Sequence, residues 1–156
     1  MNRQGLQGSQ CPQEIRVLTF AVRGIKMGVD TEQVASVMEL AEAESSGLAV
    51  LHFHDQVSFG KMPADYQSPK AIMINDKSKP YIVVIDNPDD IAVVNVRSIQ
   101  PIPPLIAMNK TTNMFWGAIP NKEGITLLVD FSRIRGRQEE LLRQATIPIH
   151  NEEVRQ

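Results

Sequence analysis

Short runs in which apolar and polar residues alternate recur along the chain, and they predict strands rather than long helices. Residues 16–22 alternate so that Leu18, Phe20 and Val22 share one face of a strand, and residues 25–29 return as a second strand. Further extended segments are expected at 37–40, 48–53, 56–61, 71–74, 81–85 and 91–96. The pattern therefore predicts an all-β fold with short helices.

One segment departs from alternation, because residues 81–85 (Tyr-Ile-Val-Val-Ile) are apolar at every position. A strand of this kind has both faces covered by other layers. A polar loop at 75–79 joins it to the preceding strand in a hairpin. In a small β protein, a strand covered on both faces predicts two barrels or sheets packed against each other.

The last strong pattern is a closing hairpin. Residues 114–119 and 124–130 are both largely apolar, and Pro120-Asn121-Lys122-Glu123 between them has the composition of a turn. A proline-rich connector at 99–105 leads into it. This region carries no residues suited to catalysis, which favours a binding module over an enzyme.

Helical signals are few. Asp30 stands at the N-cap position of a short helix expected at 31–36, and residues 131–145 have helical spacing. The acidic segment 41–47 is expected to be a loop. The whole pattern predicts a disordered leader at 1–13, one domain at 14–145 with two interlocked subdomains and a crossover near 62–70, and a tail at 146–156.

Composition narrows the class of protein. The formal net charge is −2 and the sequence pI is about 5.9, which argues against a protein that binds nucleic-acid backbones. No run reaches the roughly 18 apolar residues of a membrane span, so no membrane insertion is expected. The single cysteine, Cys11, allows no internal disulfide, which fits a reducing, cytoplasmic location.

Candidate chemistry is sparse. The sequence has no phosphate-binding glycine loop, zinc-protease helix, paired Cys-x-x-Cys or nucleophile elbow, so no enzyme activity and no cofactor are expected. His52 and His54 could face the same side of a strand and share a metal ion, but two surface histidines beside a buried Phe53 are the alternative. No metal site is therefore assigned.

Four pieces, in this order and spacing, resemble a CheW-like domain, the adaptor module of bacterial chemotaxis arrays. They are residues 17–37 for the opening strands and short helix, 81–93 for the middle hairpin, 99–104 for the proline-rich approach and 115–130 for the last hairpin. The resemblance covers roughly residues 16–134. It implies two packed five-stranded, SH3-like barrels with short helices and a C-terminal helix, without catalysis or cofactor.

The resemblance also implies a function in signal transduction. Family members couple a chemoreceptor to the histidine kinase CheA by docking the kinase's regulatory domain, which is itself CheW-like. Surface complementarity and strand edges supply the affinity in such contacts. Transferred by position, the partner-binding residues are Val37, Leu40, His52, Phe53, His54, Asp55, Val57 and Phe59.

One departure from the family pattern leaves alternatives open. Typical members carry an Asn-Leu-Arg-Gly turn where this chain has His52-Phe53-His54-Asp55. The aspartate tolerates a positive φ less readily than glycine. Two alternative functions therefore stay open. The chain could be a regulatory or sequestering subunit with a replacement partner, or a metal or small-molecule sensor that uses His52 and His54.

Overall fold

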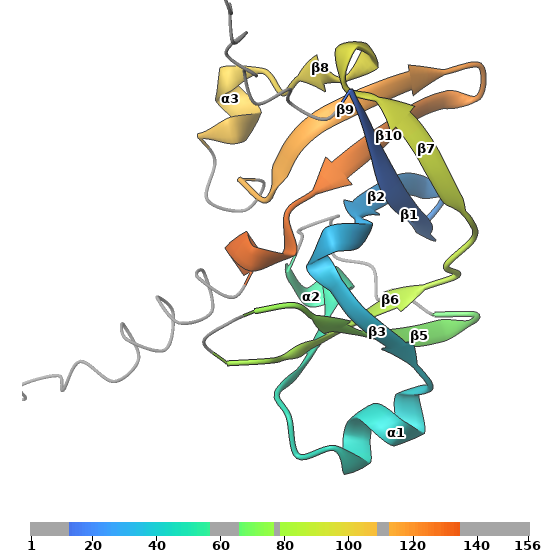
Figure 1. The fold of residues 1–156 in the computed structure, drawn as a ribbon, viewed down its shortest axis with the longest axis vertical. Coiled ribbons are helices and arrows are strands. Elements are labelled where there is room, and N and C mark those ends of the chain that lie inside the picture. Colours follow the sequence, from blue (N-terminus) through green and yellow to red (C-terminus); the bar gives the residue numbers. More distant parts are fainter. Residues whose placement is uncertain (1–12, 57–65, 77–78, 109–112, 135–156) are drawn as a thin grey trace, which may run out of the picture.

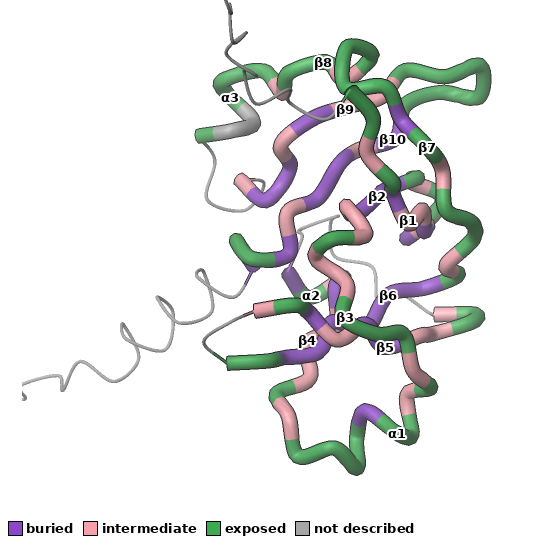
Figure 2. Tube along the Cα trace, in the orientation of Figure 1, coloured by how far each residue is buried: buried purple, intermediate pink, exposed green. Residues whose placement is uncertain are grey.

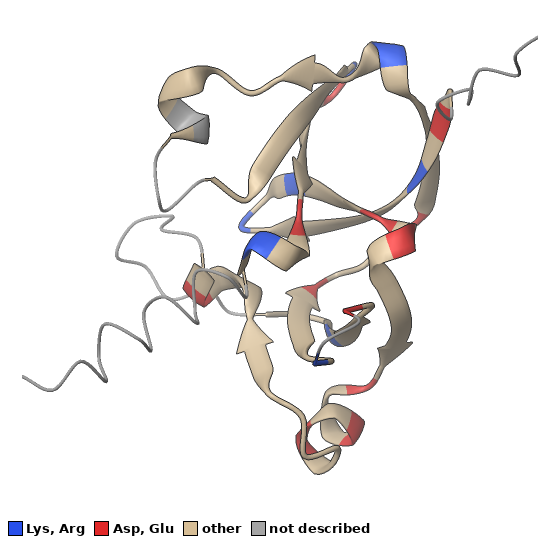
Figure 3. Cartoon of the chain, turned by 60° about the vertical axis from the view of Figure 1, so that its left-hand side comes forward, with Lys and Arg blue, Asp and Glu red and all other residues tan. Residues whose placement is uncertain are grey.

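Ten strands form two sheets in the part of the chain that the structure, a computed structural model, describes: residues 13–56, 66–76, 79–108 and 113–134 (Figure 1). The larger sheet has six strands. In spatial order they are β7 (Ile91–Asn95), β1 (Glu14–Val22), β2 (Ile25–Asp30), β10 (Gly124–Val129), β9 (Phe115–Asn121) and β8 (Gln100–Pro101). This sheet curls into a ring (Figure 3).

Turn residues fix the antiparallel pairs of the six-stranded sheet. Arg23 and Gly24 join β1 to β2, and both have positive φ, at 53° and 74°. Two positive φ values in a two-residue turn match the right-handed twist of the strands on either side. The predicted last hairpin is confirmed as β9 and β10, in which Asn121 pairs with Gly124.

The smaller sheet has four strands that follow one another in the sequence. In spatial order they are β3 (Val34–Met38), β5 (Pro69–Ile74), β6 (Ile82–Asp86) and β4 (Val50–His52). Short helical elements connect the strands: η1 (Thr31–Gln33), α1 (Leu40–Ser45), α2 (Phe53–Gln56), η2 (Val96–Ser98) and α3 (Pro104–Ala107). The all-β prediction with short helices is confirmed.

The strand β6 is the layer that the two halves of the molecule share. Its odd-numbered side chains, Val83 and Ile85, belong to a core that the six-stranded sheet also builds. Its even-numbered side chains, Ile82 and Val84, pack instead with Ala43 of α1. All four are 0% exposed, so the prediction that both faces are covered is confirmed (Figure 2).

A second core lies inside the ring of the six-stranded sheet and occupies part of it. Val17, Val94 and Leu128 are its buried members, and Ile99 and Trp116 are among the residues that pack against them. Two glycines let the strands approach here. A Cβ atom on Gly28 would lie 2.2 Å from a methyl carbon of Val17, and one on Gly117 would lie 2.6 Å from Ile99. The sequence therefore needs glycine at both places for lack of space.

The chain passes between the sheets at two short segments. It leaves the six-stranded sheet through η1, and it returns between Asp86 and Ile91. The crossover predicted near 62–70 is therefore not a change of sheet, because β4 and β5 on either side of it both belong to the four-stranded sheet. The predicted boundaries at 13, 145 and 146 lie at or outside the ends of the described residues.

Three further details correct the sequence-based prediction. The described strands divide six and four rather than five and five. The predicted loop at 41–47 is mostly α1, because Leu40-Ala41-Glu42-Ala43 is a run of good helix formers with Ala43 buried. The helix expected at 31–36 is only η1, because β-branched Val34 begins β3. Residues 131–134 are helical, and the rest of the predicted C-terminal helix lies outside the described residues.

Candidate partner-binding surfaces

The predicted docking turn forms the end of β4 and a single helical turn. His52 is the last residue of β4, and Phe53 begins α2. Phe53 is 0% exposed, and its ring lies 5.3 Å from that of Phe20 and 6.1 Å from that of Phe131. The prediction that Phe53 contacts a partner is therefore wrong, because its ring fills the core between the sheets.

The two histidines lie beside a tyrosine that the prediction did not include. The rings of His52 and His54 are 5.7 Å apart, and the ring of Tyr66 is 5.0 Å from that of His54. The backbone N–H of His54 donates a hydrogen bond of 3.0 Å to the Tyr66 hydroxyl. Burial raises the pKa of Tyr66 to about 12, so the hydroxyl is neutral at physiological pH.

Exposed charge in this cluster comes from Asp55. Its Oδ1 lies 3.0 Å from His54 Nε2, and its side chain is 63% exposed. The other ring nitrogen of His54, Nδ1, is buried without a hydrogen-bond partner among the described residues. His54 and Asp55 can therefore contact a partner protein from the solvent side. The inner side of the His54 ring is covered, because Nδ1 is buried and Tyr66 packs against the ring.

The metal alternative lacks a third ligand in the part of the chain that the structure describes. No group of three or more His, Cys, Asp or Glu side chains is placed there to hold an ion. His52, His54 and Asp55 are neighbours, but among the described residues the Asp55 carboxylate contacts the ring of His54 and not that of His52. The histidine pair by itself is a weak ligand set, since structural zinc has four ligands.

Val37 and Leu40 lie away from the histidines. Val37 is 50% exposed on β3, and Leu40 begins α1, where it packs against the cluster around Ala43. β3 and β4 are opposite edges of the four-stranded sheet, so the prediction joins two separate surfaces. The α1 surface is acidic and has no basic residue in the helix (Figure 3). Val57 and Phe59 lie outside the described residues.

Sequence reasoning missed a third surface, the outer face of β7. Ile91 and Val93 are 56% and 60% exposed, whereas Val94 of the same strand faces the inside of the ring and is 8% exposed. β7 is an edge strand among the described strands, and it pairs only with β1. Arg16 and Leu18 lie opposite Val93 and Ile91 in that register. The sequence shows only a short apolar run at 91–94, which does not tell which face of the strand is covered.

Strand edges and exposed β-branched residues are features that protein partners use. An edge offers unpaired N–H and C=O groups, and apolar side chains beside it add buried area on binding. The β7 face has both features. The His54–Asp55 surface on the other sheet offers polar contacts instead, so these two candidate surfaces differ in their chemistry.

Comparison with known proteins gives a likeness of fold. No protein-family model matches the chain, and no curated protein matches it. Among solved structures, it is similar to the scaffolding protein TtCheW from Thermoanaerobacter tengcongensis, with a TM-score of 0.62 and 13% identity. The match covers 80% of this chain and 90% of that one. The CheW-like fold expected from the sequence is therefore confirmed.

The comparison adds nothing at the level of single residues, because identity of 13% leaves side chains to be judged from their own surroundings.

Among the described residues, no helix is both long and apolar enough to cross a membrane.

Proposed function

We propose that this chain is a non-enzymatic adaptor that binds other proteins in a sensory signalling assembly of the chemotaxis type. The observation that carries the proposal is the CheW-like fold over nine tenths of a protein described as a scaffold.

The finer proposal concerns the partners. They are the regulatory domain of the histidine kinase CheA and a chemoreceptor, and the complex forms in the cytoplasm. A regulatory domain with the same fold would offer its own strand edges and apolar residues. Two such domains can pair edge to edge, with side chains above and below the joined strands supplying specificity.

The face of β7 is the surface that we assign to the kinase partner. Ile91 and Val93 are more than half exposed and lie two residues apart, so they point the same way from the strand. Burying such side chains contributes about 25 cal/mol for each Å² of apolar surface removed from water. Arg16, opposite Val93 on β1, supplies a charge at the rim of the same face.

The test is a calorimetric titration of the full chain with the CheA regulatory domain from the same organism. We expect binding in the micromolar range, weakened by Val93→Glu about tenfold or more, which is about 1.4 kcal/mol. Ile125→Glu is the matched control, because Ile125 is 59% exposed but lies on β10. It should leave the affinity unchanged.

Other results separate the parts of the proposal. Binding that is insensitive to Val93→Glu but lost with His54→Ala would move the docking surface to the end of β4. No heat, with no co-elution on a sizing column, would contradict the kinase as partner. The replacement partner would then be sought by cross-linking from a photoreactive residue placed at position 93.

A further inference from the structure

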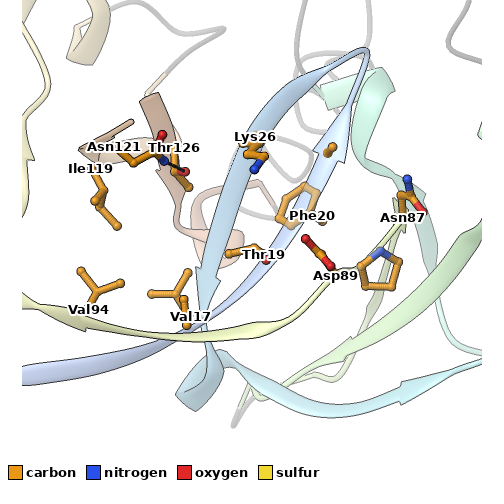
Figure 4. Close-up of a pocket in the computed structure, with 13 residues that line it drawn as sticks. Val17, Thr19, Phe20, Lys26, Asn87, Asp89, Val94, Ile119, Asn121 and Thr126 are labelled. Carbon is orange, nitrogen blue, oxygen red and sulfur yellow. Dashed lines mark hydrogen bonds between the residues drawn. The ribbon is translucent and has the colours of Figure 1, made fainter. Parts of the chain in front are cut away.

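A cavity of about 510 Å³ opens inside the ring of the six-stranded sheet (Figure 4). Strands β1, β2, β7, β9 and β10 line it, together with residues 87–89, which follow β6. Its volume lies within the range of about 300–1,000 Å³ that is typical of small-molecule sites. None of these residues belongs to the β7 face or to the histidine cluster described above.

The inner wall of the cavity is apolar. Val17 and Phe20 of β1 are each 1% exposed, Val94 of β7 is 8% exposed, and Ile119 of β9 completes this wall. The side chains of Ile91 and Val93 point away from the same strand that sends Val94 inward. An aliphatic or aromatic group placed against this wall would contact apolar side chains.

The rim of the cavity carries one charge of each sign. Lys26 of β2 and Asp89 of the β6–β7 connection both line it. Lys26 Nζ lies 2.7 Å from Glu123 Oε2, which raises the pKa of the lysine, and Asp89 adds to the effect. An ammonium has three donors, so one contact with Glu123 leaves capacity for a ligand.

The carboxylate of Asp89 is also available to bind a ligand. Its backbone N–H donates to the carbonyl of Thr19 at 2.8 Å, which fixes the turn that carries it. Its side chain is exposed and accepts no hydrogen bond from a described residue. The turn thus holds an acceptor at the rim of the cavity, which Phe20 also lines (Figure 4).

We infer that this cavity binds a small zwitterion with an apolar substituent, namely an α-amino acid with a large apolar side chain. Its carboxylate meets Lys26, its ammonium meets Asp89, and its side chain lies against Val17, Val94 and Ile119. A ligand with only one charge leaves the group of like sign on the rim opposed to it, so it binds less tightly. The inference does not depend on the adaptor function.

The experiment compares three probes of the same shape by calorimetry on the full chain. L-Phenylalanine carries both charges, 3-phenylpropanoate carries only the carboxylate, and 2-phenylethylamine carries only the ammonium. We expect phenylalanine to bind at least about tenfold more tightly than either analogue. Equal binding of the three probes, or no binding of phenylalanine at millimolar concentration, would overturn the inference.

Variants assign the two charges. Lys26→Met and Asp89→Asn should each weaken phenylalanine binding by about tenfold or more. Lys122→Met is the matched control, because Lys122 is exposed in the neighbouring turn and does not line the cavity. If Lys26→Met and Asp89→Asn leave the affinity at the control value, the rim charges do not recognise the ligand and the inference is wrong.

A last measurement locates the ligand. In a titration of the unmodified chain followed by amide NMR shifts, the resonances of Thr19, Ala92 and Thr126 should move, since these residues line the cavity. Ala92→Trp should fill the cavity and abolish binding, with thermal unfolding used to check that the variant is folded. Shifts confined to another part of the chain would contradict the assignment, whatever the behaviour of the variant.

Discussion

Tyr66 shows how one side chain ties the surface cluster to the core. Its hydroxyl accepts the backbone N–H of His54, its ring stacks edge-on against that histidine, and Phe53 next in the chain is buried in the core. Burial deprives the charged phenolate of the water that would stabilise it, so burial is the main cause of the raised pKa of Tyr66.

The first prediction concerns the titration of Tyr66. Because burial holds its pKa near 12, against 10.0 for a free tyrosine, a spectrophotometric titration should show an ionisation near pH 12 that Tyr66→Phe removes. The folded state keeps this proton more strongly than the unfolded state. The stabilising effect is therefore fully present below about pH 10 and is lost as pH rises towards 12.

The matched comparison uses the second tyrosine. The chain has two, and the Tyr81 hydroxyl donates to the carbonyl of Phe131 in the core. A difference spectrum between the unmodified chain and Tyr66→Phe isolates the Tyr66 signal. If that difference titrates near pH 10, the Tyr66 hydroxyl is solvated and its described burial is wrong.

At the scale of elements, one side chain of η1, that of Gln33, links the crossing between the sheets to the residues that follow β10. Gln33 Nε2 donates to Asp130 Oδ1 at 3.1 Å, and Gln33 Oε1 accepts the backbone N–H of Phe131 at 2.9 Å. The amide thus uses its donor and its acceptor on two consecutive residues at the end of β10. A glutamine has the required pair of groups, and a glutamate does not.

The second prediction is that Gln33→Glu destabilises the fold in a pH-dependent way. At pH 7 the new carboxylate faces that of Asp130, so the loss of the hydrogen bond and the repulsion should cost about 1–3 kcal/mol in urea unfolding. Two close carboxylates raise the pKa of one of them in the folded state. The loss should therefore shrink as pH falls to about 4.

Gln33→Met is the control for this pair. It removes both hydrogen bonds at similar volume and introduces no charge, so its cost should vary little between pH 7 and pH 4. If Gln33→Glu and Gln33→Met show the same pH dependence, repulsion with Asp130 is absent, and the bridge described here does not form in solution.

Elements with a strong local pattern were predictable from the sequence. Residues 82–85 of β6 are all apolar, and the β9–β10 turn is polar between apolar runs, so the identity of these elements does not depend on distant residues. The start of η1 after Asp30 was predictable, but its short length and the presence of α1 were not, because η1 ends where Val34 joins β5 and α1 depends on burying Ala43 against β6. Both are decided by tertiary contacts.

The candidate surfaces were predictable only in part. His54 and Asp55 do reach the surface, but Phe53 beside them lies in the core because Phe20 and Phe131, distant in sequence, enclose it. Val93 was missed because an apolar residue in a strand is ambiguous until the covering layers are known. Which face of a strand lies outside is a property of the fold rather than of the local sequence.

At the scale of the whole molecule, the two sheets share one core. Phe20 and Val29 of the six-stranded sheet contribute to the same buried cluster as Ile72 and Val83 of the four-stranded sheet. Neither sheet can lose this contact without exposing apolar surface of the other. The described part of the chain should therefore unfold as one cooperative unit.

The third prediction tests this coupling with Phe53→Ala. Removing the ring should cost about 3–5 kcal/mol of unfolding free energy. The fluorescence of Trp116, the one tryptophan, reports on β9 of the other sheet. Its urea midpoint should fall together with that of the far-ultraviolet circular dichroism.

Val37→Ala serves as the control, because Val37 is half exposed and its truncation should change stability by no more than about 0.5 kcal/mol. A Trp116 transition that stays in place while the circular dichroism splits into two steps would show that the sheets unfold separately.

The four-stranded sheet is an insertion within the six-stranded one, and this order matters while the chain is being made. β1 and β2 leave the ribosome early, yet β2 pairs with β10, which is synthesised near the end. The closing Gln33–Asp130 contact spans 97 positions. Until residue 129 emerges, the edge of β2 that pairs with β10 has no partner strand, so the nascent chain presents chaperones with an extended binding target.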